Sequence, residues 1–210
     1  MKQPAYPVAN SQIVKSKYMS YAFLQPVASN AIQTLTFRGN DIYRPGFSIA
    51  DTNTALPYQE WKDFYKNYYV YGSKIQVIVN NVSAETGGVK PRFYCSLTAN
   101  PSAAFTAADL NSIMVSTLRP NTIVKYINTP SIGGHAKFSM FMKTSKMFGV
   151  DTSKEDNYEG DFVNSTPPVD QFFYSINIGH PTGQTLYFDY RVKIIYYLML
   201  RTRRTFFEDD

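Results

Sequence analysis

Residues 57–79 change their hydrophobic period midway, and this change constrains the fold more than any other feature of the chain. The first half carries large rings at helical spacing, at Tyr58, Trp61, Phe64, Tyr65 and Tyr68. After Gly72 the period becomes two, with the alternate set Ser73, Ile75, Val77 and Val79. The pattern predicts a short aromatic helix that runs through Tyr69 directly into a half-buried strand. Such a helix must lie on the sheet that it feeds, because isolated helices below about 12 residues are marginal in water.

Period-two patterns and turn residues predict seven more strands. They cover residues 13–25, 32–37, 92–98, 122–127, 135–142, 171–178 and 186–200, with Pro, Gly and Asn at most of the breaks. The last strand has an almost wholly apolar alternate set that should point into the core, namely Leu186, Phe188, Tyr190, Val192, Ile194, Tyr196 and Leu198. A second helix is expected from Thr106, because Asp109 follows it at capping-box spacing. Eight strands without alternating crossover helices favour an all-β sandwich or jelly roll.

No linker divides the chain, so we expect one domain. At 210 residues, with 44% hydrophobic and 16% aromatic residues, the chain can bury a substantial core. We assign residues 1–12 to a short N-terminal segment, 13–204 to the domain and 205–210 to an acidic C-terminal tail. The formal net charge of +5 is compatible with nucleic acid as a partner but too small to establish it. The location of the cations therefore matters more than their number.

The cysteine count and the apolar runs indicate the compartment. Cys95 is the only cysteine, so no intrachain disulfide can form, and we expect it to be buried on a strand. The sequence begins without an apolar segment of signal-peptide length, and no run approaches the roughly 20 residues of a membrane span. These features predict a soluble protein made in a reducing compartment, with no membrane insertion.

Catalytic motifs are almost absent from the sequence. His135 and His180 do not form a metal-spaced pair, and no P-loop, dinucleotide fingerprint or nucleophile elbow occurs. We therefore expect neither an enzyme nor a cofactor. The acidic residues of 151–161 could hold a cation, yet their spacing does not match an EF-hand loop, and we assign them no role.

Three stretches together resemble the capsid proteins of circular Rep-encoding single-stranded DNA (CRESS-DNA, circovirus-like) viruses. They are PYQEWKDFYKNYYVYGSKIQV at 57–77, KTSKMFGV at 143–150 and VKIIYYLMLRTRR at 192–204. The resemblance implies a single eight-stranded jelly roll, with strands B to I starting near 13, 32, 70, 91, 122, 136, 171 and 186. It also implies self-assembly into a T=1 icosahedral shell of sixty copies around a circular single-stranded DNA genome. The protein would then reside in the virion, pass through the host nucleus or cytoplasm during assembly, and meet a host receptor that its residues do not identify.

Long loops are the expected assembly contacts in this interpretation. They comprise residues 39–56, 99–120 and 144–170, which are rich in Pro, Asn and Thr and longer than ordinary connections. Many weak copies of one contact can stabilise a closed shell without any single contact being strong.

The resemblance departs at the N-terminus, where such capsid proteins often carry an arginine-rich arm. This chain offers only Lys2, Lys15 and Lys17 there. Either such an arm is missing from this sequence, or the folded domain makes the main contacts with the genome. In a jelly roll, strands B, I, D and G form one sheet, and the residues opposite its core set are strongly basic. They include Lys15, Lys17, Lys74, Lys137, Lys143, Arg191 and Lys193. We expect this surface to face the particle interior, with Tyr21 and nearby aromatics available to stack on bases.

Two alternatives remain open at this stage. The face could be a solvated polar surface with scattered ion pairs, for example to Asp189. The protein could also be a non-viral jelly-roll binding module, either lectin-like or specific for single-stranded nucleic acid, that never forms a shell.

Overall fold

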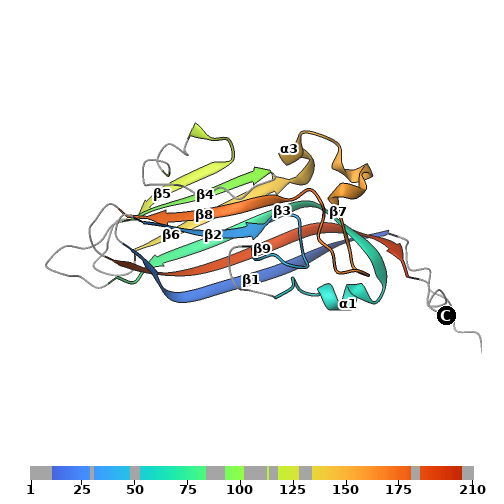
Figure 1. Cartoon of the computed structure of the whole chain (residues 1–210), viewed down its shortest axis with the longest axis horizontal. Coiled ribbons are helices and arrows are strands. Elements are labelled where there is room, and N and C mark those ends of the chain that lie inside the picture. Colours follow the sequence, from blue (N-terminus) through green and yellow to red (C-terminus); the bar gives the residue numbers. More distant parts are fainter. Residues whose placement is uncertain are drawn as a thin grey trace, which may run out of the picture.

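Two antiparallel sheets stack face to face in the computed structural model (Figure 1). The structure describes residues 11–28, 31–47, 53–83, 93–101, 113, 118–127, 134–180 and 185–204. The first sheet has the order β1 (Ser11–Val27), β9 (Leu186–Arg203), β3 (Tyr65–Asn81) and β6 (His135–Lys143), and β7 (Glu159–Asp161) pairs with β3. The second has the order β2 (Ile32–Arg38), β8 (Phe172–Gly179), β4 (Phe93–Pro101) and β5 (Thr122–Ile127). These two sheets form the predicted jelly roll, with β7 as an added short strand.

The core lies between the two sheets, and β9 supplies much of it. All seven residues of the predicted alternate set on β9 are buried, six of them at 0% exposure. Their partners on β3 are those expected, since Ile75 pairs with Ile194 and Val77 with Val192. On β4, Cys95 is buried as predicted, and burial raises the pKa of its thiol.

The central helix is shorter than its aromatic spacing predicts. Helix α1 covers only Tyr58–Lys62, and Tyr65 and Tyr68 belong to strand β3. The prediction of a helix through Tyr69 is therefore wrong. This stretch is a strand that pairs with β9 along one edge and with β7 along the other, and side chains on both of its faces are buried. Tyr68 points into the core beside Phe162, with ring centroids 5.0 Å apart, whereas Tyr69 lies under the segment after β6.

A buried carboxyl group fastens the loop after β2 to the first sheet. Asp41 Oδ1 accepts hydrogen bonds from the Tyr68 hydroxyl at 2.9 Å and from the Tyr43 amide at 2.8 Å. Arg38 Nε lies 3.9 Å from Asp41 Oδ2, which accepts no hydrogen bond from the described residues. Burial raises the pKa of Asp41 above its ordinary 3.8, because desolvation outweighs these favourable partners.

The segment between β6 and β8 holds three short helices, α3 (Thr144–Phe148), η2 (Thr152–Lys154) and η3 (Asp156–Tyr158). Helix α3 ends at Gly149, whose φ of 74° is left-handed and suits glycine. Of the helix expected from Thr106, only Ile113 is described, and it is helical. Residues 1–10 and the tail 205–210 lie outside the described residues, whereas Ser11 and Gln12, assigned to the N-terminal segment, belong to β1. Among the helices that the structure describes, none has the length and apolar character needed to cross a membrane.

Candidate nucleic-acid interface

The outward surface of the first sheet, which we call the basic face, is arranged in four cross-strand rows. Each row takes one residue from each of β1, β9, β3 and β6. The rows are Lys15 with Tyr197, Gly72 and Lys143; Lys17 with Ile195, Lys74 and Phe141; Met19 with Lys193, Gln76 and Ser139; and Tyr21 with Arg191, Ile78 and Lys137. Successive rows lie about 7 Å apart, because each residue advances a strand by about 3.4 Å.

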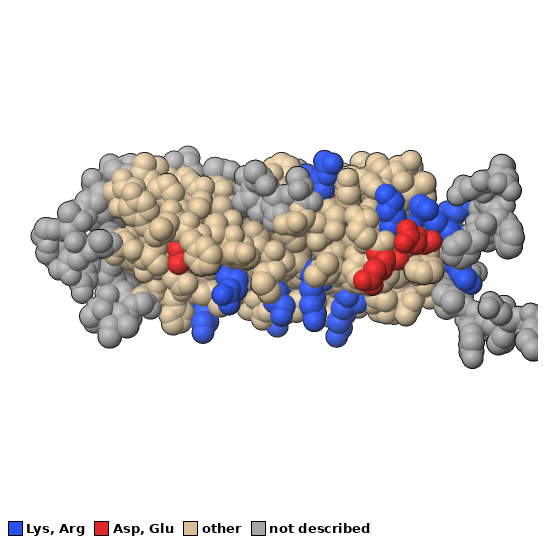
Figure 2. All heavy atoms as spheres, turned by 90° about the horizontal axis from the view of Figure 1, so that it is seen from below, with Lys and Arg blue, Asp and Glu red and all other residues tan. Residues whose placement is uncertain are grey.

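All seven cations predicted as nucleic-acid ligands lie on these four rows. Five are exposed, and Lys74 and Lys193 are half-buried. No row contains a carboxylate, and no described carboxylate forms an ion pair with any of the seven. Figure 2, which views the molecule from the side of β1 in Figure 1, shows Lys and Arg side chains projecting in a row along the lower edge. The face therefore collects more positive charge than the whole chain carries net.

Asp189, the expected source of an ion pair, lies beyond the last row. Its Oδ1 accepts a hydrogen bond from the backbone N–H of Leu24 at 2.8 Å, where β1 shifts register. Asp189 thus supports a bulge in the edge strand, and the described structure shows no salt bridge from it to the basic face.

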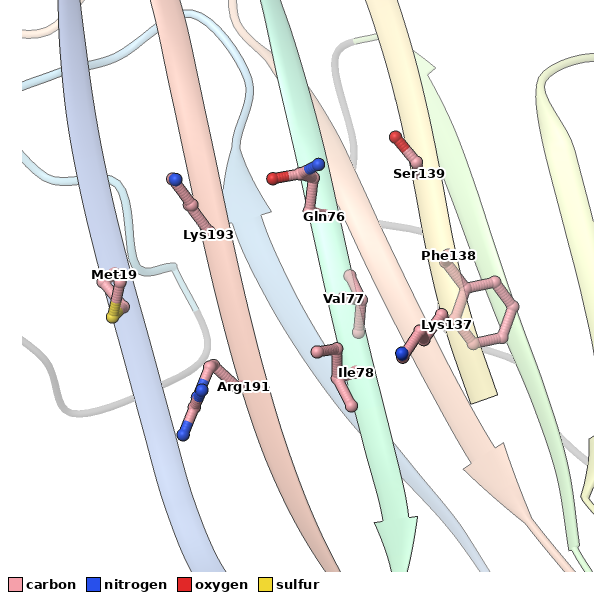
Figure 3. A pocket seen from close by; sticks show the side chains of 9 residues that line it. All are labelled: Met19, Gln76, Val77, Ile78, Lys137, Phe138, Ser139, Arg191 and Lys193. Atoms are coloured by element: carbon pink, nitrogen blue, oxygen red, sulfur yellow. The ribbon is translucent and has the colours of Figure 1, made fainter. Parts of the chain in front are cut away.

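An open hollow of about 470 Å³ lies in the last two rows (Figure 3). Arg191 and Lys193 project from β9 on one side of β3, and Lys137 projects from β6 on the other. Gln76 and Ser139 add hydrogen-bonding groups, and the remaining lining is Met19, Val77, Ile78 and Phe138. Three cations around a partly apolar hollow suit a phosphate joined to a less polar group, as in a nucleotide.

A second hollow of about 420 Å³ extends the face over the edge of β1. It shares Met19 and Lys193 with the first hollow and is otherwise lined by Lys17, Tyr18, Asn53, Thr54 and Leu56. The loop that forms its wall is held by backbone hydrogen bonds between Lys17 and Leu56 in both directions, at 3.0 and 2.8 Å. This pairing also satisfies part of the exposed edge of β1.

The structure adds an aromatic cluster that the sequence reasoning missed. Tyr71, Phe141 and Tyr197, from β3, β6 and β9, meet on the basic face, where Tyr197 lies 6.1 Å from Tyr71 and 5.8 Å from Phe141 between ring centroids. Lys15 Nζ lies 5.5 Å from the centroid of the Tyr197 ring. Strand parity placed Phe141 and Tyr197 on the same face as Lys143 and Lys193, so that signal was available in the sequence. Tyr71 reaches the face only through a β-bulge.

Three of the five acidic residues of 151–161 have structural roles. Asp151 caps η2 by accepting from Ser153, and these bonds lower the pKa of Asp151. Glu159 pairs with Arg201, whose guanidinium stacks over Tyr69 at 5.1 Å. Asp161 accepts from the backbone N–H of Val163 at 2.6 Å. The described residues contain no group of three acidic, histidine or cysteine side chains placed to hold a metal ion.

The second sheet offers few described cations. Lys125 on β5 donates to the carbonyl of Lys137 at 2.6 Å and lies over the Phe138 ring, so it is bound at the boundary between the sheets. Arg92, just before β4, is outside the described residues.

Chains of several solved virus structures are similar in fold to this chain. A chain of tobacco necrosis virus matches with a TM-score of 0.50 at 12% identity, covering 94% of this chain and 85% of that one. A decameric BFDV capsid protein matches at 0.46 and 13% identity, covering 91% and 99%, and turnip yellow mosaic virus in its empty-head form at 0.41 and 10%, covering 100% and 91%. No family model and no curated protein matches the chain. The likeness to the tobacco necrosis virus chain, at 12% identity, shows a shared jelly-roll fold.

Proposed function

We propose that this chain is a non-enzymatic capsid protein that assembles into a T=1 icosahedral shell around a circular single-stranded DNA genome. The fold shared with the tobacco necrosis virus chain supports a capsid role. The sixty-copy shell, the circular DNA and passage through the host nucleus or cytoplasm rest on the sequence resemblance to CRESS-DNA virus capsid proteins. The protein would act in the virion.

The basic face is the observation that carries the genome-binding part of this proposal. Seven cations in four rows, without a carboxylate among them, match a polymer with one negative charge per nucleotide. Four strands spaced about 4.8 Å apart make a surface about 14 Å wide between β1 and β6, wide enough for one strand of nucleic acid. In the shell this face is directed inward, and the loops at the ends of the sandwich meet neighbouring copies.

Exposed apolar side chains in the three long loops support their role as assembly contacts. The described parts of loops 39–56, 99–120 and 144–170 expose large apolar side chains that are available to pack against neighbouring copies, among them Phe47, Leu56, Leu118, Val150, Val163 and Val169. Scattered over several loops, these side chains suit several modest contacts per copy, as a closed symmetric shell requires.

Expression of the full chain followed by electron microscopy tests the shell, and nuclease-protected nucleic acid in the particles tests the basic face. Changing Lys15, Lys17, Arg191 and Lys193 together to Glu should leave particles with much less protected nucleic acid. A control that changes Lys15, Lys17 and Lys193 to Arg keeps the charge and should package normally. Normal packaging by the Glu variant would contradict the assignment of this face.

The same experiments separate the proposal from a nucleic-acid-binding module that forms no shell. Such a module would bind single-stranded DNA yet sediment as a monomer or small oligomer at every concentration and salt tested. That outcome would refute the capsid function while leaving the basic face as a binding surface.

A further inference from the structure

We propose that Tyr71, Phe141 and Tyr197 form a stacking site for unpaired bases, which makes the basic face prefer single-stranded over double-stranded DNA. This inference rests on the proposed function, because it assigns a partner to the same surface. The seven cations alone do not distinguish the two forms, since both present phosphates. Bases offer their faces only where they are unpaired, so an accessible aromatic surface can select the single strand.

Tyr71 owes its position to a β-bulge in β3. Val70 pairs with Leu198 and Gly72 pairs with Tyr197, so Tyr71 has no partner residue on β9. The extra residue lets Tyr71 and Gly72 lie on the outward side in succession, and the Tyr71 ring reaches Tyr197 at 6.1 Å.

Gly72 makes room for the third ring. A Cβ at Gly72 would lie 3.1 Å from the Phe141 ring and 3.0 Å from the Met142 carbonyl oxygen, closer than ordinary contacts allow. The missing side chain therefore lets Phe141 lie against the β3 backbone and meet Tyr197 edge to face, at 5.8 Å and 80°. Phe141 nevertheless stays 47% exposed, so its ring remains available to a ligand.

Four lysines surround this aromatic cluster in the first two rows. Lys15 and Lys143 share the row of Tyr197, and Lys17 and Lys74 share the row of Phe141. A base on the rings would thus have cations for the phosphates on either side of it. Aromatic surfaces flanked by cations are the arrangement by which proteins bind single strands without reading their sequence.

Binding of three labelled probes to the full chain tests the assignment: a single-stranded oligonucleotide, its duplex, and an abasic oligonucleotide of the same length. The test variant combines Tyr197→Thr with Phe141→Thr, which removes two rings, keeps every cation and retains residues that favour strands. We expect a loss of tenfold or more for the single strand, since stacking is worth about fivefold to a hundredfold per base. Binding of the duplex and of the abasic strand should not change.

A matched control is Tyr187→Thr with Tyr126→Thr, because both tyrosines are exposed at 42% and lie off the four rows. It should leave all three affinities unchanged. If the test variant lost affinity for the abasic strand as strongly as for the normal one, the rings would act only by holding the lysines, and the stacking site would be refuted.

Photo-crosslinking of the unaltered chain keeps the inference testable even if the variant misfolds. A single strand containing 5-iodouracil should crosslink to peptides that hold Tyr71, Phe141 or Tyr197. Crosslinks found only elsewhere would overturn the inference. If the unaltered chain bound single strand, duplex and abasic strand equally, only the stacking site would fail; if it bound none of them, the proposed function would fail as well.

Discussion

The number of cations on the basic face predicts how steeply DNA binding falls with salt. For single strands, the slope of log K against log salt concentration is about −0.7 per phosphate neutralised. If each of the seven cations neutralises one phosphate, the slope is about −5, and affinity falls about a thousandfold between 50 and 200 mM salt. Changing Arg191 and Lys193 to Gln removes two of these contacts. The slope should then become about −3.5, a loss of about 130-fold over the same range.

Fluorescence anisotropy of a labelled single strand measures this slope, with the full chain kept below the concentration at which it assembles. The control changes Lys146 and Lys154 to Gln, which alters the net charge equally but lies on α3 and η2, where both side chains are exposed. Its slope should stay near −5. Equal slopes for the two variants would mean that net charge, and not this face, binds DNA.

Three further predictions concern stability and assembly. Ile194→Ala should lower the free energy of unfolding by about 2 to 5 kcal/mol in urea titrations, since Ile194 is wholly buried, whereas Ile13→Ala, at a position 66% exposed, should change it little. Because burial raises the pKa of Asp41, the folded protein loses stability as the pH rises from 3.8 to the folded-state pKa. Asp41→Asn does not ionise, so its stability relative to the unaltered chain should increase over this pH range and stay constant above it. A stability difference that is constant with pH would contradict this. Val169→Asp should raise the concentration needed for particle formation, seen by light scattering, without changing the unfolding midpoint, because Val169 is 79% exposed.

The sequence predicted the sheets well because period-two patterns survive wherever one side of a strand faces the core. The β9 set from Leu186 to Leu198 shows this, since every alternate residue is buried. The helix prediction failed because the first part of β3 is buried on both faces. Tyr65 and Tyr69 are buried on the face opposite to Tyr68, and three buried rings at i, i+3 and i+4 have the spacing of a helix.

The basic face was predictable because parity alone brings Lys15, Lys17 and Lys74 to the side opposite the core. The sequence could not predict which cations share a row, because the rows depend on the register between strands that are distant in the chain. The hollow between Arg191, Lys193 and Lys137 is likewise a product of that register and has no local signal.

The bulge at Tyr71 follows from the core, and the position of the aromatic cluster follows from the bulge. Tyr68 and Val70 are both fully buried at even positions, whereas Ile75 and Val79 are fully buried at odd ones. A regular strand would put one pair outside, so β3 must contain one extra residue between them. The extra residue is Tyr71. It points outward because it follows the buried Val70, and Gly72 points outward because it precedes the buried Ser73. Because both halves of β3 bury their apolar side chains, the strand contains a bulge, and the Tyr71 ring lies on the basic face next to Tyr197.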